Sequence, residues 1–436
     1  MALMAGIGMI VFGSVSAVVL DKFQSEQLSA IERKASILGL EKPAENANVE
    51  FVAELYSIIK ESYWDKISDN DLSELFLLAT QKITKEYVTI PSHDEAGVRA
   101  LVERTTAGMS DKNKKTFVTS LGDVVLANLK PAARSRLYTK KQEEALRNTV
   151  ENVNPEVDLY ADLGLTKGAS MSEIDKAYSE QAKKLEAMKN SPEVEKKLQD
   201  ITYARDVLAK PSTKGNYDKG GNQPTVTGKV LKSGIAYIHI KKIAPLTLSE
   251  FSNVVDTLAP KSSDTLILDL RGNSGGAVDL LQYFLGPFIG PGQYGYEFFH
   301  QGDYDPYKTK TTWLPNVSKY TKVAVIVDHT VQSSAEVMAA ALKKYRFGVL
   351  VGTKTKGWGT IEQIIPIQHS IDDGQTYSVL IVQSVSLRDD SQPIEGRGVD
   401  PNIDITAKGW EQKLTSRFNQ PELTDAVKDL WLHPLK

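Results

Sequence analysis

A serine at the start of an alanine-rich helical stretch is the best-placed candidate nucleophile in this sequence. Ser333 follows the apolar run Val323–Val327 and precedes the helical stretch Ala335–Tyr345. A serine hydroxyl over a helix N-terminus can attack a carbonyl carbon, and the amide of Ser334 can stabilise the oxyanion that forms. Ser333 and Glu336 also form the Ser-x-x-Glu pattern of a capping box, so a purely structural role is the alternative.

A glycine-rich turn is the second candidate. The run Leu266–Gly276 is an apolar strand followed by Arg-Gly-Asn-Ser-Gly-Gly, with a helix expected to begin near Ala277. Small residues permit close approach, and backbone amides before a helix can hold an anion. The spacing fits neither the dinucleotide-binding nor the Walker pattern, so it does not predict a nucleotide site. A tight turn without a ligand is the structural alternative.

Two further stretches, Val351–Glu362 and Gly396–Ile403, follow the serine and glycine stretches along the chain. In their order and spacing, the four stretches resemble those of the carboxyl-terminal processing (tail-specific) serine peptidases, over about residues 226–405. The resemblance implies an αβ core that cleaves peptide bonds in protein substrates. The site residues that it implies are the nucleophile Ser333 and an oxyanion hole made by Gly275 or Gly276 with the Ser334 amide.

The general base is where the chain departs from that family. The resemblance places the family's lysine at Trp358, whose indole N–H can donate a proton but cannot accept one. The family's glutamine, four positions on, is Glu362 here. Lys356 is the tentative base, because in an extended segment it would lie on the same face as Trp358, about 6.6 Å away. His329 and Glu362 are alternative bases. A pseudopeptidase that binds peptides or serves as a scaffold without turnover is the alternative function.

A helical block resembles the J-domain of Hsp70 co-chaperones. The resemblance rests on Asp158–Leu165, Ala169–Tyr178 and Tyr203–Leu208. The functional His-Pro-Asp should follow the second helix, where Glu186-Ala187-Met188 stand instead, and residues 158–218 contain no histidine. Hsp70 is therefore not an expected partner, and the block is predicted to be a docking or spacer module.

The first twenty residues predict a membrane anchor. Residues 1–20 carry no charged side chain, and as a helix they would be about 30 Å long, the thickness of a bilayer's hydrocarbon core. A cleaved signal peptide with a weak site at Val15-Ser16-Ala17 and a buried core helix are the alternatives. The sequence thus predicts a single-pass protein, and the resemblance to the tail-specific peptidases implies that its soluble part is extracytoplasmic.

Composition limits the remaining possibilities. The chain has 436 residues and a net charge of −3, so it has no excess of basic residues that would indicate nucleic-acid binding. It has no cysteine, which excludes disulfides and catalysis by a thiolate. The scattered histidines predict no metal site, and no cofactor is expected. The fold class is mixed αβ and multidomain. Its expected parts are a membrane anchor (1–21), a helical region (47–150), the J-like module (156–219), the peptidase-like core (225–407) and a helical tail (408–436).

Overall fold

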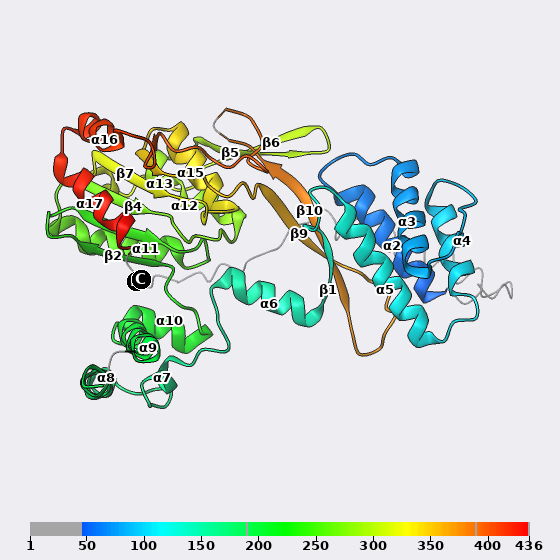
Figure 1. Cartoon of the computed structure of the whole chain (residues 1–436), viewed down its shortest axis with the longest axis horizontal. Coiled ribbons are helices and arrows are strands. Elements are labelled where there is room, and N and C mark those ends of the chain that lie inside the picture. Colours follow the sequence, from blue (N-terminus) through cyan, green and yellow to red (C-terminus); the bar gives the residue numbers. More distant parts are fainter. Residues whose placement is uncertain (1–45, 189–190, 389, 435–436) are drawn as a thin grey trace, which may run out of the picture.

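The structure is a computed structural model that describes residues 46–434, except 189–190 and 389. Figure 1 shows a sheet-containing core on the left, a helical region on the right, and a small helical module below the core. The predicted anchor at residues 1–21 lies outside the described residues. Within the part that is described, no helix is both long enough and apolar enough to cross a membrane.

The first four helices of the helical region pack through buried apolar residues, whereas the last of them, residues 140–151, has no buried residue. Phe51, Leu55 and Ile59 recur at helical spacing on α2 and are fully buried. Ser68 and Asp94 cap the following helices through their side-chain oxygens. The helices are α2 (Ala47–Ser62), α3 (Asp69–Thr84), α4 (Glu95–Thr106), α5 (Asp111–Asn128) and α6 (Lys140–Glu151).

The J-like module has a hydrophobic core of its own. Leu159, Tyr160, Ile174 and Leu208 belong to a buried cluster confined to this module. Its helices are α7 (Leu159–Asp162), α8 (Met171–Glu186), α9 (Pro192–Leu208) and α10 (Pro211–Gly220). The loop between α8 and α9 follows Glu186, as the resemblance to a J-domain predicts.

A six-stranded sheet forms the centre of the core, in the order β11-β8-β7-β4-β3-β2. Only the β2–β3 pair is antiparallel. The strands are β2 (Val226–Val230), β3 (Ala236–Ile240), β4 (Thr265–Asp269), β7 (Lys322–Val327), β8 (Val349–Gly352) and β11 (Ile403–Asp404). The carboxyl ends of β3, β4 and β7 share one edge, where ligands bind in open parallel sheets.

Helices cover both faces of this sheet. One hydrophobic cluster joins it to α11 and α15, and a second joins it to α16 and α17. The longer helices are α11 (Thr247–Leu258), α15 (Ser334–Lys344), α16 (Trp410–Phe418) and α17 (Pro421–Leu432). Short helical segments are η1 (Ala259–Lys261), η2 (Val278–Leu280), α12 (Leu281–Phe284), α13 (Gly286–Ile289) and α14 (Pro315–Ser318).

A second sheet connects the core with the helical region, as Figure 1 shows for the long strands β9 and β10. Its order is β1-β10-β5-β6, with β9 also paired to β10. The strands are β1 (Arg136–Thr139), β5 (Tyr294–His300), β6 (Asp303–Lys308), β9 (Thr360–Pro366) and β10 (Tyr377–Ser386). Strand β1 is only four residues long, and no sequence pattern predicted it.

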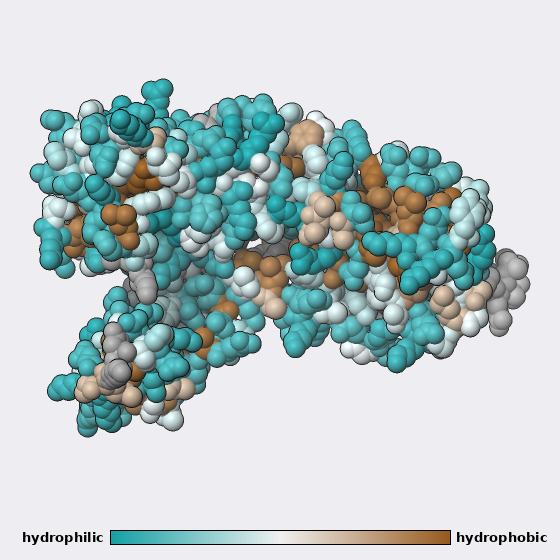
Figure 2. Space-filling model, viewed as in Figure 1, coloured by the Kyte–Doolittle hydropathy of each residue, from teal (hydrophilic) through white to brown (hydrophobic). Residues whose placement is uncertain are grey.

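Figure 2 shows a mostly hydrophilic face, with patches of hydrophobic residues over the helical region and smaller ones over the core. The mixed αβ, multidomain fold class is confirmed for the described residues.

Candidate active site

Ser333 lies at the turn between β7 and α15 in an unusual backbone conformation. Its φ is +56° and its ψ is −132°, although it has a side chain. Such a conformation costs about 1–3 kcal/mol and persists only where the surrounding structure enforces it. The residue is only half-buried, so a ligand can reach it. The structure therefore presents this hydroxyl on a strained strand-to-helix turn.

Glu336 enforces that conformation. Its fully buried carboxylate accepts hydrogen bonds from the backbone N–H groups of Ser333 (3.1 Å), Gly357 (2.7 Å) and Trp358 (2.7 Å). The Thr355 hydroxyl is a fourth donor. Burial raises the pKa of Glu336, and these hydrogen bonds oppose that rise. Glu336 thus does more than cap α15, because it also ties the serine turn to the segment before β9.

The glycine turn (residues 271–276) packs directly against Ser333. A Cβ added to Gly275 would lie 2.7 Å from the Ser333 Cβ, and Gly275 has a φ of +85°, so only glycine fits here. Ile243 holds the turn from the other side: its N–H donates to the Gly275 carbonyl at 3.0 Å, and its own carbonyl accepts from Ala277 at 2.9 Å.

The amides of the glycine turn differ in availability. The Gly275 N–H donates to the Asn273 side chain at 2.9 Å. Among the hydrogen bonds of the described residues, the N–H groups of Gly276 and Ser334 have no protein acceptor. Of the two glycines named in the sequence analysis, Gly276 therefore has the free amide.

Trp358 lies beside Ser333. Its backbone carbonyl accepts the Ser333 N–H at 3.0 Å. Its indole Nε1 donates to Glu362 Oε1 at 3.2 Å, and the guanidinium carbon of Arg134 lies 3.4 Å from the ring centroid. Arg134 also pairs with Glu395 (2.9 Å). The position that corresponds to the family's lysine is therefore occupied by an indole, which Glu362 and Arg134 hold in place.

The three candidate bases lie in different surroundings. Lys356 is exposed, and its Nζ lies 5.5 Å from the centroid of the Trp358 ring. Glu362 is half-buried, and burial raises the pKa of its carboxyl group. His329 is exposed at the end of β7. In the described part of the chain, the Ser333 hydroxyl makes no hydrogen bond to any of them.

Sequence reasoning missed Arg134 and Glu395. Arg134 lies between α5 and β1, more than two hundred residues from Trp358 along the chain, and no local motif marks it. Glu395 accepts the Gly359 N–H at 2.8 Å as well as the Arg134 guanidinium. Only the folded arrangement of β1 beside β10 brings these residues to the site.

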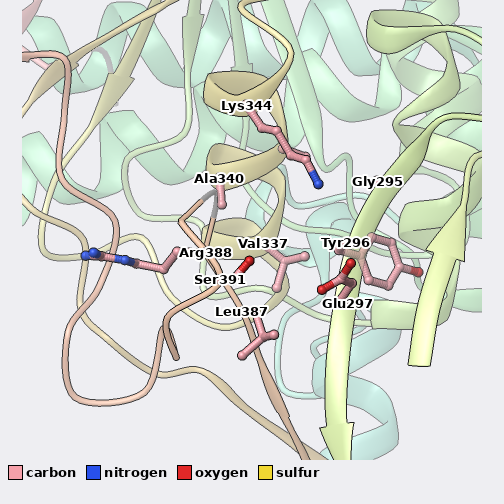
Figure 3. A pocket seen from close by; sticks show the side chains of 10 residues that line it. Gly295, Tyr296, Glu297, Val337, Ala340, Lys344, Leu387, Arg388 and Ser391 are labelled. Carbon is pink, nitrogen blue, oxygen red and sulfur yellow. The ribbon is translucent and has the colours of Figure 1, made fainter. Parts of the chain in front are cut away.

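A shallow pocket lies further along α15. Val337, Ala340 and Lys344 line it from the helix, with Glu297 from β5 and Leu387 after β10. Figure 3 shows the Lys344 side chain extending from α15 toward β5. Clusters of three or more potential metal ligands are absent from the residues that the structure describes.

Known families match two parts of the chain. Residues 234–405 match Peptidase family S41, and residues 158–218 match the DnaJ domain. The carboxy-terminal processing protease CtpA of Bacillus subtilis is 28% identical over 180 residues, which are 41% of this chain and 36% of that protein. A probable CtpA-like serine protease of Staphylococcus aureus is 24% identical over 420 residues, 93% of this chain and 72% of that protein.

Solved structures give a weaker likeness. A photosystem II D1 C-terminal processing protease superposes with a TM-score of 0.47 at 13% identity, covering 83% of this chain and 94% of that chain. For the first relatives in sequence, the Bacillus CtpA and a CtpA-like protease of Staphylococcus epidermidis, the chain covers 36% and 39% of their lengths.

Residues 234–405 are a domain of a serine peptidase family. The chain thus carries a Peptidase family S41 domain, which it shares with C-terminal processing proteases, and a DnaJ domain before it. The resemblance stated in the sequence analysis is confirmed at the level of the family.

Proposed function

We propose that this chain is a serine endopeptidase that cleaves protein substrates in the tail-specific manner, with Ser333 as nucleophile. The observation that carries the proposal is the strained conformation of Ser333, with φ +56° directly before α15 and packed against Gly275. Backbone strain of this kind clusters at active sites, where it orients a reacting group.

The proposed chemistry follows from the groups around the hydroxyl. Ser333 Oγ attacks the carbonyl carbon of the scissile peptide bond, and the carbonyl oxygen becomes an oxyanion. The N–H groups of Gly276 and Ser334 stabilise this oxyanion, since they have no acceptor of their own among the described residues. As the C–N bond breaks, the base passes the proton taken from Ser333 to the departing amine, and water then hydrolyses the acyl-enzyme ester and restores the Ser333 hydroxyl.

Lys356 remains the tentative base for this proton transfer. Its Nζ now lies 5.5 Å from the centroid of the Trp358 ring. To take the proton, it would have to move away from this ring and turn toward Ser333. Flanking Gly357, with a φ of +80°, supplies a backbone position that can adjust. Glu362 is the alternative, because burial raises the pKa of its carboxyl group toward the range useful for a base at neutral pH.

A second candidate function is a pseudopeptidase that binds peptides or partner proteins without turnover. The observation that favours it is Trp358, whose indole donates to Glu362 and stacks under Arg134. An indole fixed in this way cannot accept the serine proton. The oxyanion site would remain as a binding site.

Four variants separate the two functions in a cleavage assay with an unfolded protein substrate. Endopeptidase function predicts that Ser333→Ala abolishes cleavage, and that Lys356→Ala does so if Lys356 is the base. Full activity of Lys356→Ala alongside inactive Glu362→Gln would transfer the role to Glu362. A wild-type rate no higher than that of Ser333→Ala, with activity gained in Trp358→Lys, would establish the pseudopeptidase.

The other parts of the chain receive proposed roles as well. Residues 1–21 anchor the protein in a membrane and place the described part on the extracytoplasmic side. The J-like module is a docking or spacer module without Hsp70 stimulation, because it lacks His-Pro-Asp. Stimulation of an Hsp70 ATPase by the full chain would contradict this assignment.

A further inference from the structure

The glycine turn begins with an arginine whose side chain is fixed by a buried carboxylate. The Arg271 guanidinium donates to Asp269 through Nη2 at 2.6 Å and through Nε at 2.9 Å. Asp269 Oδ1 also accepts the Arg271 backbone N–H at 3.0 Å. The Arg271 side chain is 11% exposed and that of Asp269 is 2% exposed, so solvent screens this pair little. Both the side chain and the backbone of Arg271 are therefore tied to the last residue of β4.

The same guanidinium contacts the end of the C-terminal helix α17. Its Nη2 donates to the Leu430 carbonyl at 3.1 Å, across 159 residues of sequence, and its carbon lies 5.5 Å from the centroid of the Trp431 ring. Leu430 and Trp431 belong to the last turn of α17, where backbone carbonyls have no partner within the helix and carry partial negative charge. Arg271 thus links the glycine turn to a helix that is distant in sequence.

The link lies close to the proposed oxyanion site. Four residues after Arg271, Gly275 packs against Ser333. The next residue, Gly276, has the free amide that the proposed function assigns to the oxyanion. The direction of this amide depends on the path of the turn, and that path starts at Arg271.

Two further contacts hold the backbone at the start of the turn. The His239 ring donates through Nε2 to the Arg271 carbonyl at 2.8 Å, and the Gly272 N–H donates to the Thr330 hydroxyl at 2.6 Å. These contacts remain when the guanidinium is removed. Loss of the link to α17 should therefore displace the turn without unfolding it.

An arginine is suited to this link in a way that a lysine is not. Its planar guanidinium has five N–H donors, which can hold a carboxylate with two of them and reach another acceptor in a second direction. The helix has its own attachment to the sheet, because Leu423, Val427 and Leu430 are buried in the hydrophobic cluster that joins the two. The link thus orients the turn more than it holds the helix.

We propose that Arg271 is a positioning residue through which α17 holds the glycine turn in the conformation that binds the oxyanion. This inference rests on the proposed function, since an oxyanion forms only if Ser333 attacks a peptide carbonyl. The turn binds the oxyanion of the transition state and not the ground state of the substrate, so the link should act on kcat and not on KM.

The first test measures cleavage of a fluorogenic peptide by the full-length chain. Arg271→Gln keeps a donor for Asp269 but lacks the fork that also reaches Leu430. Its kcat should fall about 10- to 100-fold, with KM changed by less than about twofold. Arg271→Lys keeps the charge and should recover part of this loss. Arg147→Gln is the matched control, because Arg147 is an exposed arginine of α6 and its replacement should leave kcat unchanged.

The second test breaks the link from the side of the helix and needs no turnover. A chain that ends at Asp429 lacks Leu430 and Trp431, whereas a control chain that ends at Leu432 keeps both. Amide hydrogen exchange is followed by mass spectrometry in peptides that cover the glycine turn and β7. In the chain that ends at Asp429 and in Arg271→Gln, the turn should exchange about tenfold faster and β7 should be unchanged. The control chain should match the wild type.

The outcomes separate this inference from the proposed function. Unchanged exchange of the turn, equally faster exchange of β7, or an unchanged kcat in Arg271→Gln would overturn the inference. Faster exchange of the turn alone, in a chain that never cleaves peptides, would support the link and refute the peptidase. Cleavage by the wild type that neither Arg271→Gln nor the shortened helix alters would support the peptidase and refute the link.

Discussion

Replacing Glu336 perturbs the active site at its structural centre. Glu336→Ala leaves the backbone N–H groups of Gly357 and Trp358 without an acceptor, whereas the Ser333 N–H keeps the Trp358 carbonyl. Each unpaired buried donor costs about 1–3 kcal/mol, so the core should lose about 2 kcal/mol or more of unfolding free energy. That is a large share of the 5–15 kcal/mol typical of whole domains. Cleavage activity should fall to the level of Ser333→Ala.

Glu336→Gln should be milder for a specific reason. In Glu336→Gln the side-chain NH₂ can take the place of Oε1 and donate to the Thr355 hydroxyl oxygen. In that arrangement only the Gly357 N–H loses its acceptor. The expected loss is about 1–3 kcal/mol. The carbonyl oxygen in the place of Oε2 would still hold Ser333 and Trp358, so part of the activity should remain.

Urea unfolding of the two variants, followed by tryptophan fluorescence, measures these losses. Glu195→Ala is the control, since Glu195 is exposed on α9 and its removal should change stability by less than about 0.5 kcal/mol. Equal losses in Glu336→Ala and Glu336→Gln, or a loss below about 1 kcal/mol in Glu336→Ala, would refute the reasoning that this carboxylate enforces the serine turn.

Three further predictions concern single contacts. Gly275→Ala should abolish cleavage, because its Cβ would lie 2.7 Å from that of Ser333. Gly272→Ala is the control: its φ of +73° gives similar backbone strain, but its Cβ would meet no atom within 4 Å, so activity should remain. Equal activities of the two variants would contradict this prediction. A double-mutant cycle of Arg134→Ala and Trp358→Ala should give a coupling of about 0.5–2 kcal/mol in urea unfolding, and additive effects would argue against the stacking. Burial raises the pKa of the Glu362 carboxyl group in the folded protein, so its protonation stabilises the fold fully below the ordinary carboxyl pKa, and this stabilisation is lost as the pH rises through the raised pKa. Glu362→Gln should therefore flatten the plot of unfolding free energy against pH in that range. An unchanged plot would contradict the raised pKa.

Local sequence patterns predicted the elements that carry the site. The apolar run before Ser333 became β7, and the alanine-rich stretch after it became α15, since each pattern has one periodicity and one buried face. The Leu-Asp-Leu-Arg-Gly run likewise became β4 and the glycine turn. These features depend on neighbouring residues, which a sequence displays directly.

Features that depend on distant residues escaped prediction. The strand β1 is short and is stabilised by pairing with β10, so its own pattern gives little signal. Arg134 reaches Trp358 only because β1 pairs with β10. The roles of Ser333, the oxyanion amides and Lys356 stay predictions.

Covalent labelling of Ser333 tests the central claim most directly. The full-length chain would be treated with a fluorophosphonate, which reacts with activated serine hydroxyls, and the adduct would be located by mass spectrometry of tryptic peptides. An activated Ser333 on a strained turn predicts a single adduct at Ser333, absent from Ser333→Ala and strongly reduced in Gly275→Ala. A chain that hydrolyses protein substrates yet carries no adduct on Ser333 would contradict the account.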